Sequence, residues 1–393
     1  MNYSPPTCHA ALSLIGPDVG LCLQEKPLYK PEHATPFTEH PSQLRHVMEA
    51  KDLQPLGQTE PIVEPDESEN AQKQSWAKPP PDPESNFESD ADSDEASINS
   101  YETHQLDIYE ENNRRYPNDS YHMPNDEPER TRLNIVHQIY LILLDGHLTA
   151  APIVTNAPRV LDIGTGPGDW AIEMSHAYPH GTIIASDIGV FDNALGHVDL
   201  PNLSFHLDDA RDEWAYDIPF DLIHLRGLSG AFPDWSFIYQ QAFDHLAPGG
   251  YLEVADTDFA AETMIALPPN SYLRLFASAL RSADYSAGYL RDLSHLQPAL
   301  FRAQGFIDID VREYTFPIGL WPESPHDRTV GKMGLIALLE GLESYSLRAL
   351  TTTYGWVAEE VRELCDQVRA EILQGVYRIS ARVKIVTGRK PLT

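Results

Sequence analysis

From residue 159 onward, short apolar runs alternate with segments in which apolar residues recur every three to four positions. The apolar runs predict buried strands at residues 160–163, 182–186, 203–207, 220–225 and 251–255. The helical spacing predicts helices at residues 170–178 and 235–246. Strand and helix in this rhythm are typical of an α/β fold with a doubly wound, largely parallel sheet.

The pattern changes after residue 258. It predicts helices at 272–281, 293–304, 331–350 and 357–373, and strands from 305 to 311 and from 380 to 386. We interpret the two strands as the sixth and seventh of the same sheet, separated by a helical insertion at about residues 320–378. Upstream, Leu133, Val136 and Tyr140 recur at helical spacing, and Gly146 can end that helix.

Residues 1–100 differ from the rest, because Pro, Ser and acidic residues dominate and no apolar periodicity is visible. Such a segment buries too little apolar surface to offset its ordering entropy, so we predict a disordered acidic N-terminal region. Asp90, Asp92 and Asp94 resemble the start of a calcium loop, but Glu95 and Tyr101 stand where a Gly and a Glu are needed. We therefore expect a solvated linker, then an N-terminal cap segment with a helix at 101–150 and the α/β domain at 151–393.

The 393-residue chain carries 59 acidic against 28 basic side chains, a formal net charge of −31. That charge repels nucleic acid and anionic membranes, so we predict direct binding to neither. The longest apolar run, 139–144, is far shorter than the ~20 residues of a membrane span, and residues 1–23 lack the basic start of a signal peptide. Cys8, Cys22 and Cys365 are scattered, with neither disulfide nor metal spacing, which favours a reducing compartment and a cytoplasmic location.

Candidate chemistry begins at the first strand, which runs into Asp162-Ile163-Gly164-Thr165-Gly166-Pro167-Gly168-Asp169-Trp170. A glycine turn between strand and helix lets a ligand approach the backbone closely. The spacing G-x-G-x-G differs from the dinucleotide fingerprint G-x-G-x-x-G, and Asp162 and Asp169 would repel a pyrophosphate. The two acids suit a ligand with a cationic end, such as S-adenosylmethionine; an ordinary strand-to-helix turn is the alternative.

Acidic residues follow the next two strands. Asp187, with Ile188 after it, closes the second strand, where a carboxylate can accept hydrogen bonds from both ribose hydroxyls. Asp208-Asp209-Ala210 follows the third strand, where a carboxylate can accept from an adenine amino group while a backbone N–H donates to the ring. We favour Asp209 for adenine, and a turn or helix-capping pair is the alternative.

His224 and Arg226 end the fourth strand and share one of its faces, because side chains alternate along a strand. That face points either to the ligand pocket or to a packed helix. We select His224 as the candidate base or acceptor-positioning residue and Arg226 as the group that orients an anion.

In the order in which they occur, these segments resemble the fungal LaeA-like methyltransferases of the class I S-adenosylmethionine-dependent superfamily. The resemblance covers about residues 101–393 and rests on five segments: Arg114-Arg115-Tyr116 with Pro124-Asn125-Asp126-Glu127, the glycine turn with Trp170, Asp208-Asp209-Ala210 with Asp212-Glu213-Trp214, His224-Leu225-Arg226-Gly227-Leu228-Ser229-Gly230, and Gly355-Trp356 to Gly388-Arg389-Lys390-Pro391. It implies a seven-stranded Rossmann-like sheet in the order 3-2-1-4-5-7-6 with the last strand antiparallel.

The resemblance also implies that Asp162, Gly164, Gly166, Asp187 and Asp209 bind S-adenosylmethionine. To this set we add Thr165, Gly168, Trp170, Ile188, Asp208 and Ala210, and Tyr116 as a cap over the cofactor. Two departures from the family pattern stand out. Thr165 replaces a frequent Cys, and Gly375-Val376-Tyr377 stands where relatives often have His-Ala-Tyr, which removes any role of that histidine.

The sequence thus favours an enzyme that methylates a small-molecule acceptor, in fungal secondary metabolism. One alternative is a nuclear regulator that acts through protein partners, with the acidic region as a docking arm. The other is a nicotinamide-dependent oxidoreductase, which the glycine spacing and Asp162 disfavour.

Overall fold

The computed structural model describes residues 109–191 and 200–393. The predicted acidic region at 1–100, its Asp90–Asp94 run, Cys8 and Cys22 lie outside the described residues.

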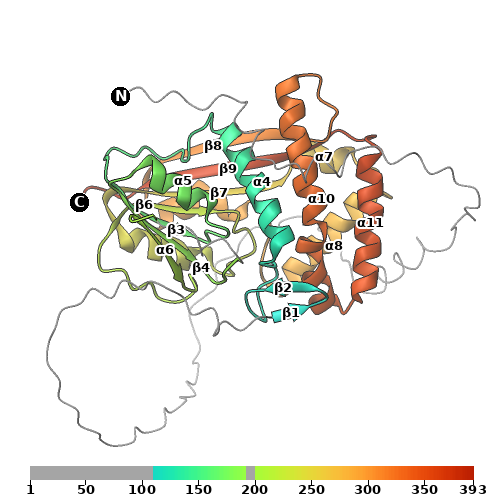
Figure 1. Cartoon of the computed structure of the whole chain (residues 1–393), viewed down its shortest axis with the longest axis horizontal. Helices are drawn as coiled ribbons and strands as arrows, with labels where there is room; N and C mark the ends of the chain where they lie inside the picture. Colours follow the sequence, from blue (N-terminus) through green and yellow to red (C-terminus); the bar gives the residue numbers. More distant parts are fainter. Residues whose placement is uncertain (1–108, 192–199) are drawn as a thin grey trace, which may run out of the picture. The chain divides into compact units, whose positions relative to one another are not determined.

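The centre of the fold is a seven-stranded sheet in the order β5-β4-β3-β6-β7-β9-β8 (Figure 1). Counted from β3 as the first strand, this is the order 3-2-1-4-5-7-6, and β9 runs antiparallel to both of its neighbours, as predicted. The strands are β3 (Arg159–Ile163), β4 (Thr182–Asp187), β5 (Leu203–Leu207), β6 (Phe220–Arg226), β7 (Leu246–Phe259), β8 (Ile307–Ile318) and β9 (Ile379–Arg389).

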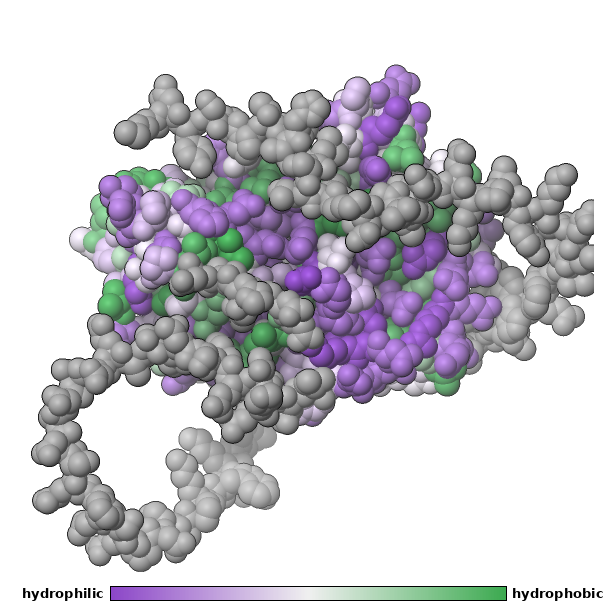
Figure 2. Space-filling model, in the orientation of Figure 1, coloured by the Kyte–Doolittle hydropathy of each residue, from purple (hydrophilic) through white to green (hydrophobic). Residues whose placement is uncertain are grey.

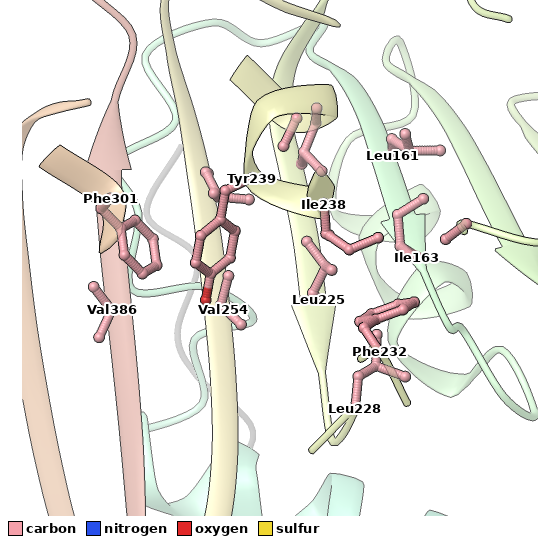
Figure 3. Close-up of a cluster of buried hydrophobic side chains, with 14 of the residues drawn as sticks. Leu161, Ile163, Leu225, Leu228, Phe232, Ile238, Tyr239, Val254, Phe301 and Val386 are labelled. Atoms are coloured by element: carbon pink, nitrogen blue, oxygen red, sulfur yellow. The ribbon is translucent and has the colours of Figure 1, made fainter. Parts of the chain in front are cut away.

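Alternating side chains give the sheet two apolar faces, and helices cover both. On one face, Leu161 and Ile163 of β3 lie in one cluster with Ile238 and Tyr239 of α6 (Trp235–His245) and with Phe301 of α9 (Pro298–Ala303) (Figure 3). Their burial removes large apolar surface from water, the main stabilising contribution to the fold.

The opposite face carries α5 (Asp169–Ala177), whose Trp170 and Met174 are buried against Val160 and Leu222. Asp162 and His224 have the same parity along their strands as these two residues, so they belong to this second face. This parity decides which helix covers the candidate site residues.

The predicted insertion consists of α10 (Pro325–Tyr354) and α11 (Ala358–Leu373), between β8 and β9. Both pack against α8 (Tyr272–Ala287), and α10 also packs along α4 (Glu127–Leu143) (Figure 1). The helix α7 (Ala261–Ala266) follows β7. Figure 2 shows mostly hydrophilic side chains where the helices at the right of Figure 1 face solvent, which is the polar side of an amphipathic layer.

Upstream of α4, residues 109–126 form a segment that we call the strap. It begins with a two-stranded hairpin of β1 (Tyr109–Glu111) and β2 (Arg114–Tyr116). Arg348 of α10 donates hydrogen bonds to Glu111 and to the carbonyl oxygens of Asn118 and Tyr121, which ties the strap to the insertion.

Several predicted elements differ from the structure in their bounds, three of them clearly. The helix expected at 293–304 is a 3₁₀ turn, η2 (Ser294–Leu296), followed by α9, because Pro298 holds Gln297 in extended backbone. The strand expected at 305–311 is β8, which is longer than predicted and ends at Ile318. It lies at the edge of the sheet, where one side of the strand can be polar and face solvent. The fifth strand extends from Leu246 to Phe259, since β9 pairs along most of its length.

In the ranges 109–191 and 200–393, none of the helices combines the length and the apolar character that a membrane crossing requires.

Candidate active site

A cavity of about 380 Å³ lies at the carboxyl ends of β3, β4 and β6 and extends to the insertion helices. Open α/β sheets bind their ligands at this edge. It brings together most of the predicted site residues: Asp162, Gly164, Thr165, Gly166, Trp170, Asp187, Ile188, Asp208, Asp209, Ala210, His224 and Arg226 all line it. Gly168 and Tyr116 are not among the residues that line this cavity.

The glycine turn adopts the backbone that its sequence predicts. Gly164, Gly166 and Gly168 have positive φ angles of 67°, 59° and 89°, which L side chains rarely adopt. A Cβ atom on Gly164 would collide with the side chain of Leu228. The hydroxyl of Thr165 is buried at the cavity with no hydrogen-bond partner among the described residues, so a polar ligand atom can satisfy it there.

Gly168, which does not line the cavity, has a structural role at the start of α5. It precedes the first residue of α5, and a Cβ there would come within 2.8 Å of the Phe205 ring. Its missing side chain therefore lets α5 approach β5 closely.

Asp187 lies at the end of β4, directly beside the turn that follows β3. Its Oδ2 accepts a hydrogen bond from the N–H of Gly166 at 2.8 Å, and its Oδ1 accepts from Gly189 at 3.0 Å. Burial, with a contribution from the charge of Asp162, raises the pKa of Asp187 to about 6. Backbone N–H groups of Gly166, Gly189 and Ile188 stabilise the carboxylate form, and its remaining acceptor capacity can take a ribose hydroxyl.

The predicted adenine residue, Asp209, is paired with Arg211, whose guanidinium nitrogen lies 2.6 Å from the carboxylate. Burial opposes ionisation of Asp209, but the hydrogen bonds from Arg211 outweigh it and hold its pKa below its usual range. Asp208, whose side chain is 54% exposed, lies near His206. Asp209 thus remains a carboxylate that can accept a hydrogen bond at the cavity.

His224 is buried and held on three sides. Its Nδ1 lies 2.7 Å from Oδ1 of Asp162, and its ring stacks on Trp170 with centroids 3.8 Å apart. Its Nε2 is 4.0 Å from the carboxylate of Glu253 on β7. A histidine with these contacts is arranged to orient Asp162 rather than to meet an acceptor.

Glu253 continues this row of polar groups into the backbone. Its Oε2 accepts hydrogen bonds from the N–H groups of Ala150 and Ala151 and from the hydroxyl of Thr149. A buried row therefore runs from Asp162 through His224 and Glu253 to the segment that leads into β3, and it fixes the strand edge next to the glycine turn.

The strap, predicted to cap the cofactor through Tyr116, covers the cavity through other residues. Tyr116 is buried beneath Arg348, whose guanidinium carbon is 3.6 Å from the ring centroid. Tyr121 and His122, a few positions later, line the cavity. The side chains that cover the cavity, Tyr121 and His122, thus lie a few positions after Tyr116, the residue that the sequence suggested.

His122 is the least engaged imidazole of the cavity wall. Its ring nitrogens make no hydrogen bond with any of the described residues, and its ring contacts Tyr121. Burial, and the nearby charges of Arg291 and Arg348, lower the pKa of His122 well below its usual range. At neutral pH it is an uncharged ring with a free acceptor nitrogen.

The cavity end remote from the turn is mainly apolar, and polar groups there are paired. Two buried ion pairs, Glu129–Arg132 and Asp284–Arg291, have N–O distances of 2.6 and 2.5 Å. Both arginines reach Tyr345, Arg132 at its hydroxyl and Arg291 at its carbonyl. The apolar lining comes from the insertion and the strands beside it: Phe276, Leu280, Phe316, Ile318, Ala337 and Leu338.

Known proteins resemble this chain over most of its length. The family profile described as a methyltransferase domain matches residues 135–296. The methyltransferase pytC of Aspergillus terreus is 30% identical over 274 residues, which cover 69% of this chain and 84% of that protein.

Two relatives are named for other roles. The secondary metabolism regulator LAE1 of Cochliobolus heterostrophus is 33% identical, covering 69% of this chain and 90% of that protein. The protein-methionine methyltransferase laeA of Emericella nidulans is 29% identical, covering 72% and 77%. With the sheet order, the glycine turn and the acids at the ends of β3 and β4, these relationships show that the chain belongs to the fungal LaeA-like family of S-adenosylmethionine-dependent methyltransferases.

Proposed function

We propose that the enzyme methylates a small, largely apolar molecule that occupies the part of the cavity next to the insertion. The observation that carries this proposal is the continuity of the cavity: the same walls include the glycine turn and the apolar side chains of α8, β8 and α10. Cavities of a few hundred Å³ with mostly apolar walls and few polar groups suit small ligands. The net charge of −31 supports an acceptor other than nucleic acid.

The bound cofactor supplies a methyl group on a sulfonium that is already a reactive donor. The protein's task is to align an acceptor atom with that methyl group and to exclude water. Alignment of this kind contributes up to about 7–11 kcal/mol to lowering a barrier. The strap over the cavity and the apolar walls fit this positioning role.

We assign His224 to orienting Asp162, in place of the base role suggested by the sequence. Its Nδ1 is engaged with Asp162 and its ring is stacked on Trp170, contacts that fit an orienting role better than the role of a base. We assign His122 to the acceptor instead, as a hydrogen-bond acceptor for an O–H or N–H group. Its low pKa makes it a weak proton acceptor, so its contribution is orientation.

A second candidate is methylation of a protein, or regulation through protein partners, because two of the relatives carry such names. The strap favours the small molecule: Pro117 and residues 121–125 line the cavity where a protein segment would have to enter. We propose a cytoplasmic location for the small-molecule enzyme. The regulator role would require a nuclear location, and it would make the acidic residues 1–100 a docking segment for protein partners.

One experiment separates the two candidates. The purified protein is incubated with methyl-labelled S-adenosylmethionine and an extract of the organism that encodes it, divided by ultrafiltration into small molecules and proteins. We expect the label in a small molecule that mass spectrometry identifies. Asp187→Ala, which lacks the carboxylate proposed for the ribose, is the matched blank. Labelling confined to the protein fraction would refute the small-molecule acceptor.

A further inference from the structure

Asp256 of β7 is a carboxylate of the cavity wall that is 2% exposed. Glu129 and Asp284, which also line the cavity, are each paired with an arginine. Asp256 has neither an arginine nor a lysine partner among the described residues, and its charged contact is to His295, whose Nε2 lies 2.8 Å from its Oδ2. Because no fixed cation holds it in the ionised form, Asp256 remains able to take up a proton.

His295 of η2 supports Asp256 from the protein interior. The residue is 4% exposed, and its ring stacks on Trp235 with the centroids 4.1 Å apart. Its Nδ1 is buried without a hydrogen-bond partner in the described part of the chain, so a ring with its proton on Nε2 avoids burying an unpaired N–H group. In this tautomer Nε2 donates a hydrogen bond to Asp256 and fixes the direction of the carboxylate.

The loop after β6 brings Asp256 close to His122. The N–H of Ser229 donates a hydrogen bond to Oδ1 of Asp256 at 3.2 Å. Gly230 follows with a φ of 81°, and a Cβ atom there would lie 3.5 Å from Cε1 of His122 and would collide with the side chain of Arg291. Asp256 and His122 thus contact successive residues of one short loop, although one belongs to β7 and the other to the strap.

The charge of Asp256 also acts on two phenol groups of the cavity wall. Burial, followed by the charge of Asp256, raises the pKa of Tyr140. Burial, followed by the charge of Asp187, raises the pKa of Tyr121, to which Asp256 contributes as well. Both phenols therefore stay protonated and can donate hydrogen bonds, and Tyr121 lies close enough to feel both the carboxylate proposed for the ribose and Asp256.

We propose that Asp256 accepts the proton of the acceptor group, with His295 as its positioning residue, and that the acceptor is an apolar phenol or enol. This rests on the proposed function, in which His122 orients the acceptor and no residue takes its proton. The acceptor oxygen forms a bond to the methyl carbon, and the carbon–sulfur bond breaks with its electron pair left on sulfur. The O–H proton passes to Asp256 and then to solvent.

A hydroxyl group fits these neighbours better than other acceptor groups do. A carboxylate would be repelled by Asp256, and an ammonium has no use for a donor such as the Tyr121 hydroxyl. A phenol can donate to Asp256 and accept from Tyr121, and its pKa of about 10 brings its proton within reach of a positioned base. The rings of Phe276 and Phe316 in the apolar wall suit a flat molecule of this kind.

The test measures turnover and cofactor binding on the same variants. The full chain is given methyl-labelled S-adenosylmethionine and the small-molecule fraction of the extract, and the initial rate of labelling is compared with that of Asp256→Asn. The asparagine side chain has nearly the same shape and can still accept from Ser229, but it cannot take up a proton. We expect its rate to fall about 100- to 10,000-fold. Its affinity for S-adenosylhomocysteine, measured by calorimetry, should change by less than about twofold.

Asp221→Asn is the matched control. Asp221 also accepts a hydrogen bond from a backbone N–H, that of Arg159 at 2.8 Å, but it lies at the opposite end of β6 and does not line the cavity. It should keep the full rate. A loss of less than about tenfold in Asp256→Asn would overturn the proposal. So would a product that carries the new methyl group on a tertiary amine or a thioether, which have no proton to give up. If the unchanged protein labels no small molecule, the proposed function itself fails.

Two variants test His295 as the positioning residue. His295→Gln places an amide N–H near the position of Nε2, whereas His295→Leu removes the donor. We expect the rate to fall about 10- to 100-fold in His295→Leu and only severalfold in His295→Gln, at unchanged affinity for S-adenosylhomocysteine. Equal rates in the two variants would overturn the role of His295. The same pair decides the proposal if Asp256→Asn fails to bind S-adenosylhomocysteine.

Discussion

The imidazole of His224 and the carboxylate of Asp162 face each other across neighbouring strands, with Nδ1 2.7 Å from Oδ1. The β3–β6 register places the two residues directly opposite each other. Because Asp162 stands two positions before the first glycine of the turn, His224 controls the direction of the acid next to the cofactor.

This relationship predicts different outcomes for two substitutions of His224. In His224→Asn the side-chain NH₂ can replace Nδ1 as donor to Asp162, whereas His224→Ala leaves a buried carboxylate unpaired under Trp170. We expect the affinity for S-adenosylhomocysteine to fall about 10- to 100-fold in His224→Ala and only severalfold in His224→Asn. Calorimetry measures both. If His224→Ala keeps full affinity yet loses turnover, His224 is a base after all.

Asp187 predicts a pH dependence of cofactor binding. Its pKa is about 6 in the folded protein, against 3.8 for an exposed aspartate. Ribose hydroxyls bind the carboxylate form, so the affinity for S-adenosylhomocysteine should fall on the order of tenfold between pH 7 and pH 5. Asp187→Asn should bind more weakly and lose this pH step.

The carboxyl group of Asp187 also affects folding stability, and the effect of pH on stability is opposite in direction to its effect on cofactor binding. Because its pKa is raised on folding, its contribution to stability is complete below about pH 4 and is lost as the pH rises through about 6. Thermal unfolding of the protein and of Asp187→Asn between pH 4 and pH 7 measures this difference. A constant difference across that range would contradict the raised pKa.

The glycine turn predicts a steric effect beyond backbone strain. Gly164→Ala combines a φ of 67° with a collision against Leu228, whereas Gly288→Ala, at the end of α8, has a φ of 76° and nothing within 4 Å of its Cβ. Both should lose about 1–2 kcal/mol from the unfavourable φ. Only Gly164→Ala should also weaken S-adenosylhomocysteine binding by more than about tenfold. A loss of about 1.4 kcal/mol in binding free energy is enough for a tenfold effect, and a displaced turn can cause it. Equal binding in both variants would show that the close approach at Gly164 is unimportant.

The strap depends on Arg348. Its side chain is 5% exposed and contacts Glu111, two carbonyl oxygens and the Tyr116 ring. We expect Arg348→Met to lower the free energy of unfolding by about 2–4 kcal/mol. Amide hydrogen exchange should accelerate in residues 109–125.

Arg362→Met is the graded control for this strap prediction, because Arg362 is 31% exposed and reaches the strap only at the carbonyl oxygen of Asn112. Arg362→Met should accelerate amide hydrogen exchange in residues 109–125 only slightly. Equal acceleration in the two variants would show that the strap does not depend on the buried arginine.

Local patterns were enough to predict the strands and a largely parallel sheet, because each strand is a short apolar run with a turn or helix after it, whereas the strand order was implied by the family resemblance. They were less informative at element ends. The helix at 331–350 starts earlier, at Pro325, where the Ser324 side chain accepts a hydrogen bond from the N–H of Asp327; this capping signal lies in polar sequence that periodicity ignores.

The candidate site, like the fold, could be predicted from the sequence only in part. Asp162, Asp187 and Asp209 lie at or just after the ends of predicted strands, and parallel strands place their carboxyl ends together, so their meeting could be predicted. The partners of His224 and Arg226 depend on the strand register and on α4, about 90 residues before them. His122 gave no signal in the sequence, because its lowered pKa comes from burial and from the charges of Arg291 and Arg348, which folding brings from far along the chain.

The position of β9 has a consequence for how the enzyme assembles. β8 pairs with β9 alone among the described strands, so it cannot join the sheet until residues 379–389 have left the ribosome. Before that moment the first five strands can already dock with α5 and α6, while Phe316 and Ile318 of β8 are not yet paired with β9. The cofactor half is therefore expected to fold first and the acceptor wall last, and this late step is the time when the chain is most exposed to aggregation.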